Sequence, residues 1–114
     1  MRFFVRATVP LKGGNRVVLA GQMRPTIEEI VSQLKPEAVF FKAVDKGPTA
    51  GLKSIGLVLD LENASQIKSI VEPLFAAMEA KMEYEQVFSK DELMQALPTL
   101  EASVKKYGDD GRTG

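Results

Sequence analysis

The sequence contains neither cysteine nor histidine among its 114 residues. Without cysteine the chain can form no disulfide, no thiolate metal site and no thiol nucleophile. Without histidine it lacks the commonest metal ligand and the commonest general base near neutral pH. A Ser-His-Asp triad, a haem held by a proximal histidine and a histidine zinc or iron site are therefore excluded. We expect no metal and no cofactor, and only carboxylates, Lys, Arg, Tyr and hydroxyl groups remain for chemistry.

The sequence also lacks an excess of charge of either sign and any long apolar run. Fifteen Lys and Arg balance fifteen Asp and Glu, so no overall field would hold a polyanion, and we expect no nucleic acid partner. No segment approaches the ~20 apolar residues of a membrane-spanning helix. The opening residues, 1–10, alternate charged and apolar side chains, unlike a secretory signal. These absences predict a cytoplasmic protein without a membrane partner.

Alternation of apolar and polar residues predicts four strands. The clearest lies over residues 54–61, where Ile55, Leu57 and Leu59 alternate with polar or small residues, as expected for a strand with one buried face. The first strand places Arg6 on the face opposite its apolar residues. The four strands are expected over residues 1–9, 37–44, 54–61 and 82–88.

Apolar residues at helical spacing predict three helices, over residues 27–34, 67–78 and 93–104. Thr26 opens a Thr-x-x-Glu pattern at the start of the first predicted helix, and Ser89 opens a Ser-x-x-Glu pattern at the start of the last one. Both patterns are typical of capping boxes. Proline inside a helix removes a hydrogen bond, so we expect a kink or broken turn at Pro73 and a division of the last helix at Pro98. Residues 11–25 fit a short helix or an irregular segment, and the pattern does not decide.

The order strand, helix, strand, strand, helix, strand predicts a ferredoxin-like α+β domain over residues 1–107, with a flexible tail over 108–114. Right-handed crossovers would place both helices on one face of an antiparallel sheet whose strands lie in the order 4-1-3-2. The other face would carry Phe4, Val58 and either Phe40 or Phe41, covered by nothing but the final helix. An exposed aromatic face commonly indicates a partner.

Four stretches carry a resemblance to a known group of proteins: MRFFVRATVP, LKPEAVFF, GLVLDLENASQI and VEPLFAAMEAKMEYEQVFSKDEL. Over nearly its whole length the chain resembles an uncharacterised bacterial family of the dimeric α+β barrel superfamily. That resemblance implies a homodimer in which two protomers meet sheet to sheet, with a pocket at the shared interface or between each sheet and its helices. Relatives that depend on histidine have catalytic residues with no counterpart in this sequence.

Polar side chains on the predicted strands are the candidates for a ligand site, because a rigid sheet would hold them toward a cavity or a dimer interface. Arg6 could hold a carboxylate with two hydrogen bonds, and a buried carboxylate could act as a base near neutral pH. Such residues also commonly form interface ion pairs, which remains the alternative. The ligand-binding candidates are Arg6, Lys42, Asp60, Tyr84 and Glu85.

No single reaction follows from these residues, and whether the protein is an enzyme stays open. The favoured hypothesis is a homodimeric domain that binds a small apolar or aromatic molecule in an apolar pocket. A second is a cofactor-free isomerase or oxygenase that uses Asp60 or Glu85 as a base and Arg6 to hold an anion. A third is a structural or interaction module without a ligand.

Overall fold

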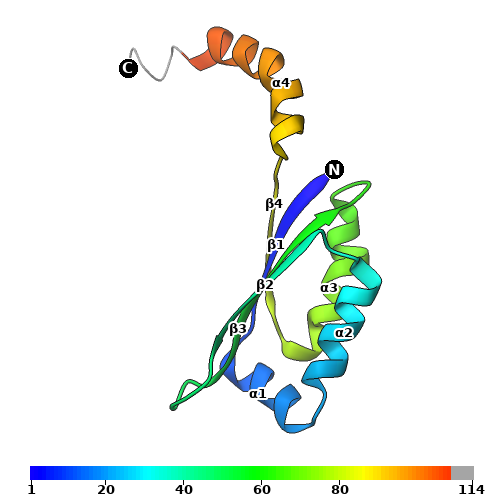
Figure 1. Cartoon of the computed structure of the whole chain (residues 1–114), viewed down its shortest axis with the longest axis vertical. Helices are drawn as coiled ribbons and strands as arrows, with labels where there is room; N and C mark the ends of the chain where they lie inside the picture. The colour runs from blue at the N-terminus through cyan, green and yellow to red at the C-terminus, as the bar shows by residue number, and fades with distance from the viewer. Residues whose placement is uncertain (109–114) are drawn as a thin grey trace.

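The computed structural model describes residues 1–108 and has the predicted order of elements (Figure 1). Its strands are β1 (Arg2–Thr8), β2 (Ala38–Val44), β3 (Gly51–Asp60) and β4 (Lys81–Gln86). Its helices are α1 (Leu11–Leu19), α2 (Met23–Leu34), α3 (Glu72–Phe75) and α4 (Lys90–Ser103), with shorter turns η1 (Ile67–Val71), η2 (Ala76–Met78) and η3 (Val104–Gly108). The strands form one antiparallel sheet in the order β2-β3-β1-β4. This is the ferredoxin-like arrangement, and the predicted fold class and strand order are confirmed.

The core lies between the sheet and the helices that cover one of its faces (Figure 1). The two central strands, β1 and β3, direct every second residue into it, which follows from the alternation of side chains along a strand. Each fully buried aliphatic or aromatic side chain contributes about 1.5–3 kcal/mol to folding. The buried apolar residues are Phe3, Val5, Ala7, Val9, Val17, Ile30, Ile55, Leu57, Leu59, Ile67, Val71, Phe75 and Met78.

The segment left undecided by the sequence, residues 11–25, is helical over most of its length. α1 begins directly after Pro10 and crosses close to the end of η2. A Cβ on Gly13 would lie 2.5 Å from the carbonyl oxygen of Met78, so only glycine permits this approach. α2 begins at Met23, and the capping box predicted at Thr26 is wrong. The helix starts earlier because Pro25 falls in its first turn, where no backbone N–H is needed.

The helix between β3 and β4 is irregular around Pro73, as predicted. A π-helical turn, η1, precedes α3, and Pro73 is the second residue of α3. The proline nitrogen has no hydrogen to donate to the preceding turn, and a wider turn fills that place. The irregular helix still buries Ile67, Val71, Phe75 and Met78 against the sheet.

α4 projects from the end of β4 and does not cover the sheet (Figure 1). The capping box at its start is confirmed: the Glu92 amide donates to the Ser89 hydroxyl, and the Ser89 amide donates to the Glu92 carboxylate. The predicted division at Pro98 is wrong, because α4 continues through it to Ser103. α4 buries none of its residues, so the carbonyl that loses its partner at Pro98 can bond to water.

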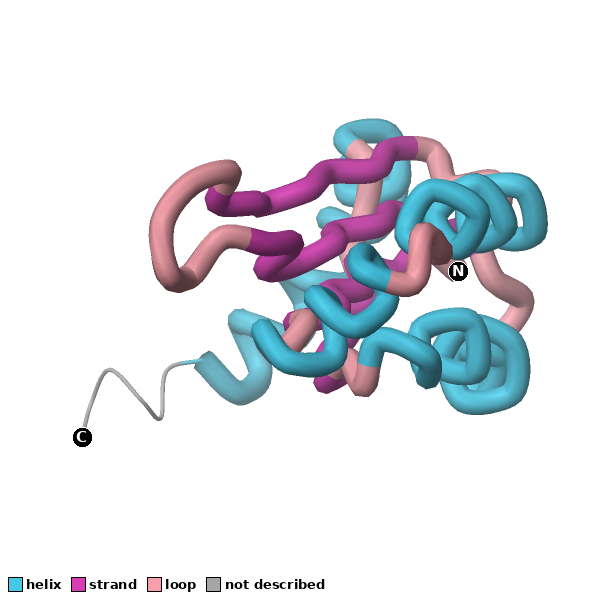
Figure 2. Tube along the Cα trace, turned by 90° about the horizontal axis from the view of Figure 1, so that it is seen from below, coloured by secondary structure: helices cyan, strands magenta, loops and turns pink. Residues whose placement is uncertain are grey.

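The projecting helix makes the molecule long. Its principal extents are 55 × 32 × 22 Å and its radius of gyration is 18.2 Å, against about 13 Å for a compact chain of this length. The loop between β2 and β3 also extends beyond the sheet (Figure 2). Gly108 ends the last helical turn, η3, and the rest of the predicted tail, 109–114, lies outside the described residues. Along residues 1–108, no helix has both the length and the apolar character needed to cross a membrane.

Candidate functional site

The face of the sheet opposite the helices, called the outer face below, is uncovered within residues 1–108. Register identifies the side chains that share it, because directly paired residues of antiparallel strands lie on the same side. Phe40 at its edge is 65% exposed. The outer face comprises Arg2, Phe4, Arg6, Thr8, Ala38, Phe40, Lys42, Ser54, Gly56, Val58, Asp60, Lys81, Glu83 and Glu85.

Arg6 lies at the centre of the outer face. Its guanidinium is 5.6 Å from the centroid of the Phe4 ring, within the range of a cation–π interaction. The strand partner of Arg6 on β3 is Gly56. A Cβ at Gly56 would lie 3.2 Å from the Phe4 ring, so the glycine leaves room for the ring to lean over β3.

Two cavities meet at Arg6, and they differ in charge. The first has a volume of about 240 Å³ and is lined by Phe4, Arg6, Glu83, Tyr84 and Glu85. The second has a volume of about 420 Å³ and is lined by Arg6, Thr8, Lys42, Lys53 and Ser54. Carboxylates therefore gather beside β4, while lysines and hydroxyl groups gather beside β2 and β3.

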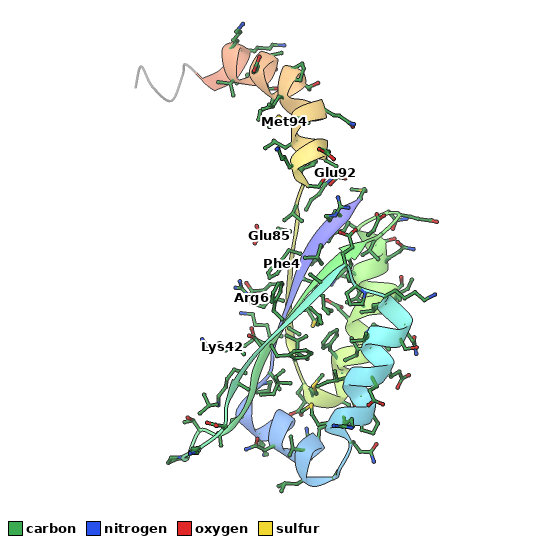
Figure 3. The ribbon with its side chains drawn as sticks, in the orientation of Figure 1. Phe4, Arg6, Lys42, Glu85, Glu92 and Met94 are labelled. Carbon is green, nitrogen blue, oxygen red and sulfur yellow. The ribbon has the colours of Figure 1, made fainter. Side chains whose placement is uncertain are left out.

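Four of the five predicted site residues line these cavities. Arg6, Tyr84 and Glu85 line the first, and Arg6 and Lys42 line the second. Figure 3 shows Arg6, Lys42 and Glu85 on the side of the sheet away from α2 and α3. The Tyr84 ring is on the helix side, where it meets Phe3 edge to face at a centroid distance of 6.2 Å.

Asp60, the fifth predicted residue, lies apart from both cavities. It pairs with Arg2 at the end of the sheet where β1 begins. Its carboxylate lies 3.2 Å from the amino group of Met1, and its side chain is 71% exposed. The structure therefore does not bring Asp60 together with Arg6.

Three residues of the second cavity were not predicted as site residues: Thr8, Ser54 and Lys53. Thr8 and Ser54 are direct partners on β1 and β3, and their alternation with apolar residues could have indicated them. Lys53 gave no such signal. The register between β2 and β3 shifts between Lys42 and Ala43, and a bulge of this kind redirects side chains in a way that simple alternation does not predict.

Arg2 joins the sheet to α4 at the far end of the outer face. Its Nε and one terminal nitrogen donate to the two oxygens of Glu37 at 2.8 and 2.9 Å, and its other terminal nitrogen donates to Glu92. The hydrogen bond to Glu37 is the main cause that raises the pKa of Arg2 above its ordinary value. The pKa of Glu92 is lowered, first by the Ser89 backbone amide and also by Arg2.

A larger and mostly apolar groove lies on the helix side, where α1 and α2 meet the ends of β2 and β3. Its volume is about 760 Å³ and it is open to solvent. Phe41, on β2, contributes to it from the face opposite Phe40. The lining residues are Val18, Met23, Arg24, Ile27, Glu28, Phe41 and Leu52.

The chemistry open to these surfaces is binding and proton transfer through exposed groups. Within residues 1–108 no three acidic side chains cluster as a metal site would require. No polar or charged residue is buried in this part of the chain, so no carboxylate there is fully removed from water.

The chain is similar in structure to 5-chloro-2-hydroxyhydroquinone dehydrochlorinase (TftG) from Burkholderia phenoliruptrix AC1100, solved in complex with 2,5-dihydroxybenzoquinone. The TM-score is 0.54 at 13% sequence identity, over 80% of this chain and 97% of that one. No family model matches the sequence, and no curated protein matches it. The similarity supports the ferredoxin-like fold.

Proposed function

We propose that the protein is a homodimer formed through the outer face of its sheet, and that it binds a small apolar or aromatic molecule in the groove on the helix side. The observation that carries the dimer is the aromatic outer face, on which Phe40 is 65% exposed and Phe4 is partly exposed. Exposed aromatic side chains on an uncovered sheet face commonly mark an interface. The resemblance to the dimeric α+β barrel superfamily supports the same arrangement.

Sedimentation at micromolar concentration tests the dimer. The native chain is expected to sediment as a dimer, and Phe40→Lys as a monomer, because the substitution adds a positive charge at the apolar part of an interface that already carries unpaired cations. Leu19→Lys is the matched control, since Leu19 is 87% exposed on the helix layer. A native chain that sediments as a monomer would refute the dimer.

The ligand proposal rests on the lining of the helix-side groove. Its volume of about 760 Å³ falls in the range of small-molecule sites, which are mostly apolar with a few polar groups at the rim. Arg24 and Glu28 provide such groups beside Met23, Ile27 and Phe41. The quinone bound by the structural neighbour TftG supports a small planar ring compound as the ligand, by analogy of fold.

An uncharged fluorescent probe, N-phenyl-1-naphthylamine, can test this groove. Saturable binding is expected, and Val18→Asp should weaken it because Val18 lines the groove. Val31→Asp is the control: Val31 is an exposed valine on α2 that does not line the groove. Equal binding by both variants would show that the probe binds elsewhere, and no binding to the native chain would favour a purely structural role.

One observation favours the second candidate, a cofactor-free isomerase or oxygenase. Glu85 and Arg6 line the same cavity, so a base and an anion holder are near each other there. Asp60 is too remote for that role. If a substrate screen finds turnover, Glu85→Gln and Arg6→Gln should abolish it; turnover that survives both would exclude this mechanism.

A further inference from the structure

Three cations and two hydroxyl groups surround the second outer-face cavity. Thr8 pairs with Ser54 across β1 and β3, and Ser54 pairs with Lys42 across β3 and β2, so these three side chains form one row. Arg6 and Lys53 complete the lining. Figure 3 shows Arg6 and Lys42 on the same side of the sheet.

Two of the three cations at this cavity are held in place, and no carboxylate lines it. Arg6 is held over Phe4 at 5.6 Å, and the ammonium of Lys53 donates to the Thr49 carbonyl. Among residues 1–108, none of Arg6, Lys42 and Lys53 forms an ion pair. Hydroxyl and cationic donors that line one cavity with no carboxylate among them are suited to an oxyanion.

The charge of the whole outer face leads to the same conclusion. Arg2 and Asp60, at the end of this face, already pair with Glu37 and Glu92 and with the amino group of Met1. Of the remaining charges, the cations Arg6, Lys42 and Lys81 on the face and Lys53 at its second cavity accompany two carboxylates, Glu83 and Glu85. A second copy brings the same excess, so no alignment of two outer faces can pair every cation with a carboxylate. Because an unpaired charge is costly to remove from water, a dimer closed on this face is more stable with an anion inside it.

We propose that this cavity binds the carboxylate or phosphate group of a small molecule, held by Arg6, Lys42 and Lys53 with hydrogen bonds from Thr8 and Ser54. The argument from charge rests on the proposed homodimer, whereas the lining residues stand without it. A volume of about 420 Å³ leaves space for an organic group beside the anion. The site is separate from the apolar groove, which lies on the other face of the sheet.

The test measures the monomer–dimer equilibrium by sedimentation, with benzoate, inorganic phosphate or uncharged benzyl alcohol added at constant ionic strength. At least one of the two anions is expected to strengthen the native dimer about tenfold, and benzyl alcohol to have no effect. Benzoate active alone identifies an organic carboxylate as the ligand class; phosphate active alone identifies a phosphate group. The same response to all three compounds, or to none, overturns the proposal.

The double variant Lys42→Gln/Lys53→Gln separates anion binding from a general effect on the fold. With two cations removed, the dimer without anion should be stronger than the native dimer, and its response to the active anion should be lost. Lys12→Gln/Lys46→Gln is the matched control, since both lysines are exposed and line neither outer-face cavity. An anion response that survives in the Lys42 and Lys53 variant overturns the assignment.

Calorimetric titration with the active anion distinguishes failure of the inference from failure of the homodimer. If the anion binds to a monomer, and this binding requires Lys42 and Lys53, the site is confirmed and the dimer is refuted. A native dimer that binds neither anion would refute the site and leave the dimer intact.

Discussion

Phe75 is the largest of the fully buried side chains and is 1% exposed. Phe75→Ala is expected to lower the free energy of unfolding by about 3–5 kcal/mol, because it removes apolar contacts and leaves a cavity. That is a large part of the about 5–15 kcal/mol typical of a domain. Urea unfolding measures the change. Phe88→Ala is the control. Because Phe88 is 57% exposed, this substitution should change the free energy of unfolding by no more than about 0.5 kcal/mol. An equal loss of stability in the two variants would contradict the assignment of Phe75 to the core.

Glu92 gives α4 a dependence on pH. Its pKa is lowered in the folded chain by the Ser89 amide and by Arg2, so its carboxylate stabilises the start of α4 at pH values above the unfolded pKa. That stabilisation is lost as the pH falls through the lowered, folded pKa. The helical circular dichroism signal should therefore decrease below about pH 4. Glu92→Gln should reduce this dependence, and Glu101→Gln, on an exposed part of α4, should not.

The positions of individual site residues were partly predictable. Alternation along β1 is enough to place Arg6 away from the core, and the same rule holds for Phe4 and Thr8. It could not place Lys53, because the bulge beside Lys42 is set by the pairing of two strands and not by the sequence of either one. Nor could it indicate that Arg2 binds Glu37 and Glu92, which are 35 and 90 residues away along the chain.

At the scale of the element, the sheet and the helices that cover it are expected to fold without α4. α4 buries no residue, and its ion pair with the rest of the described chain is Arg2 with Glu92. A chain ending at Phe88 should therefore keep the urea midpoint of the full chain under conditions where both are monomeric. A clearly lower midpoint would show that α4 packs against the sheet in solution.

Elements with strong apolar periodicity were predictable, and those set by distant contacts were not. β3 and the helix around Pro73 follow from their own patterns. α1 does not, since it contains two glycines and its place depends on the approach of Gly13 to Met78. The continuous α4 also differs from prediction, because an exposed helix can lose one hydrogen bond at Pro98 to water without ending.

At the scale of the whole molecule, the position of α4 determines the shape of the monomer. Small-angle scattering of the variant Phe40→Lys, expected to be monomeric, should give a radius of gyration near the 18.2 Å of the structure. If α4 instead folded back over the outer face, the value would fall toward the about 13 Å of a compact chain. The same experiment on the chain ending at Phe88 provides the reference for a body without the projecting helix.

The projecting helix also offers a way to measure distances between protomers. It is about 21 Å long, from its 14 residues at 1.5 Å each, and Arg2 fixes its base. Since the chain has no cysteine, Ala102→Cys would introduce a unique attachment point for a spin label near the end of α4. In a homodimer the two labels would give one separation by electron paramagnetic resonance, and that separation would report how the two sheets are oriented.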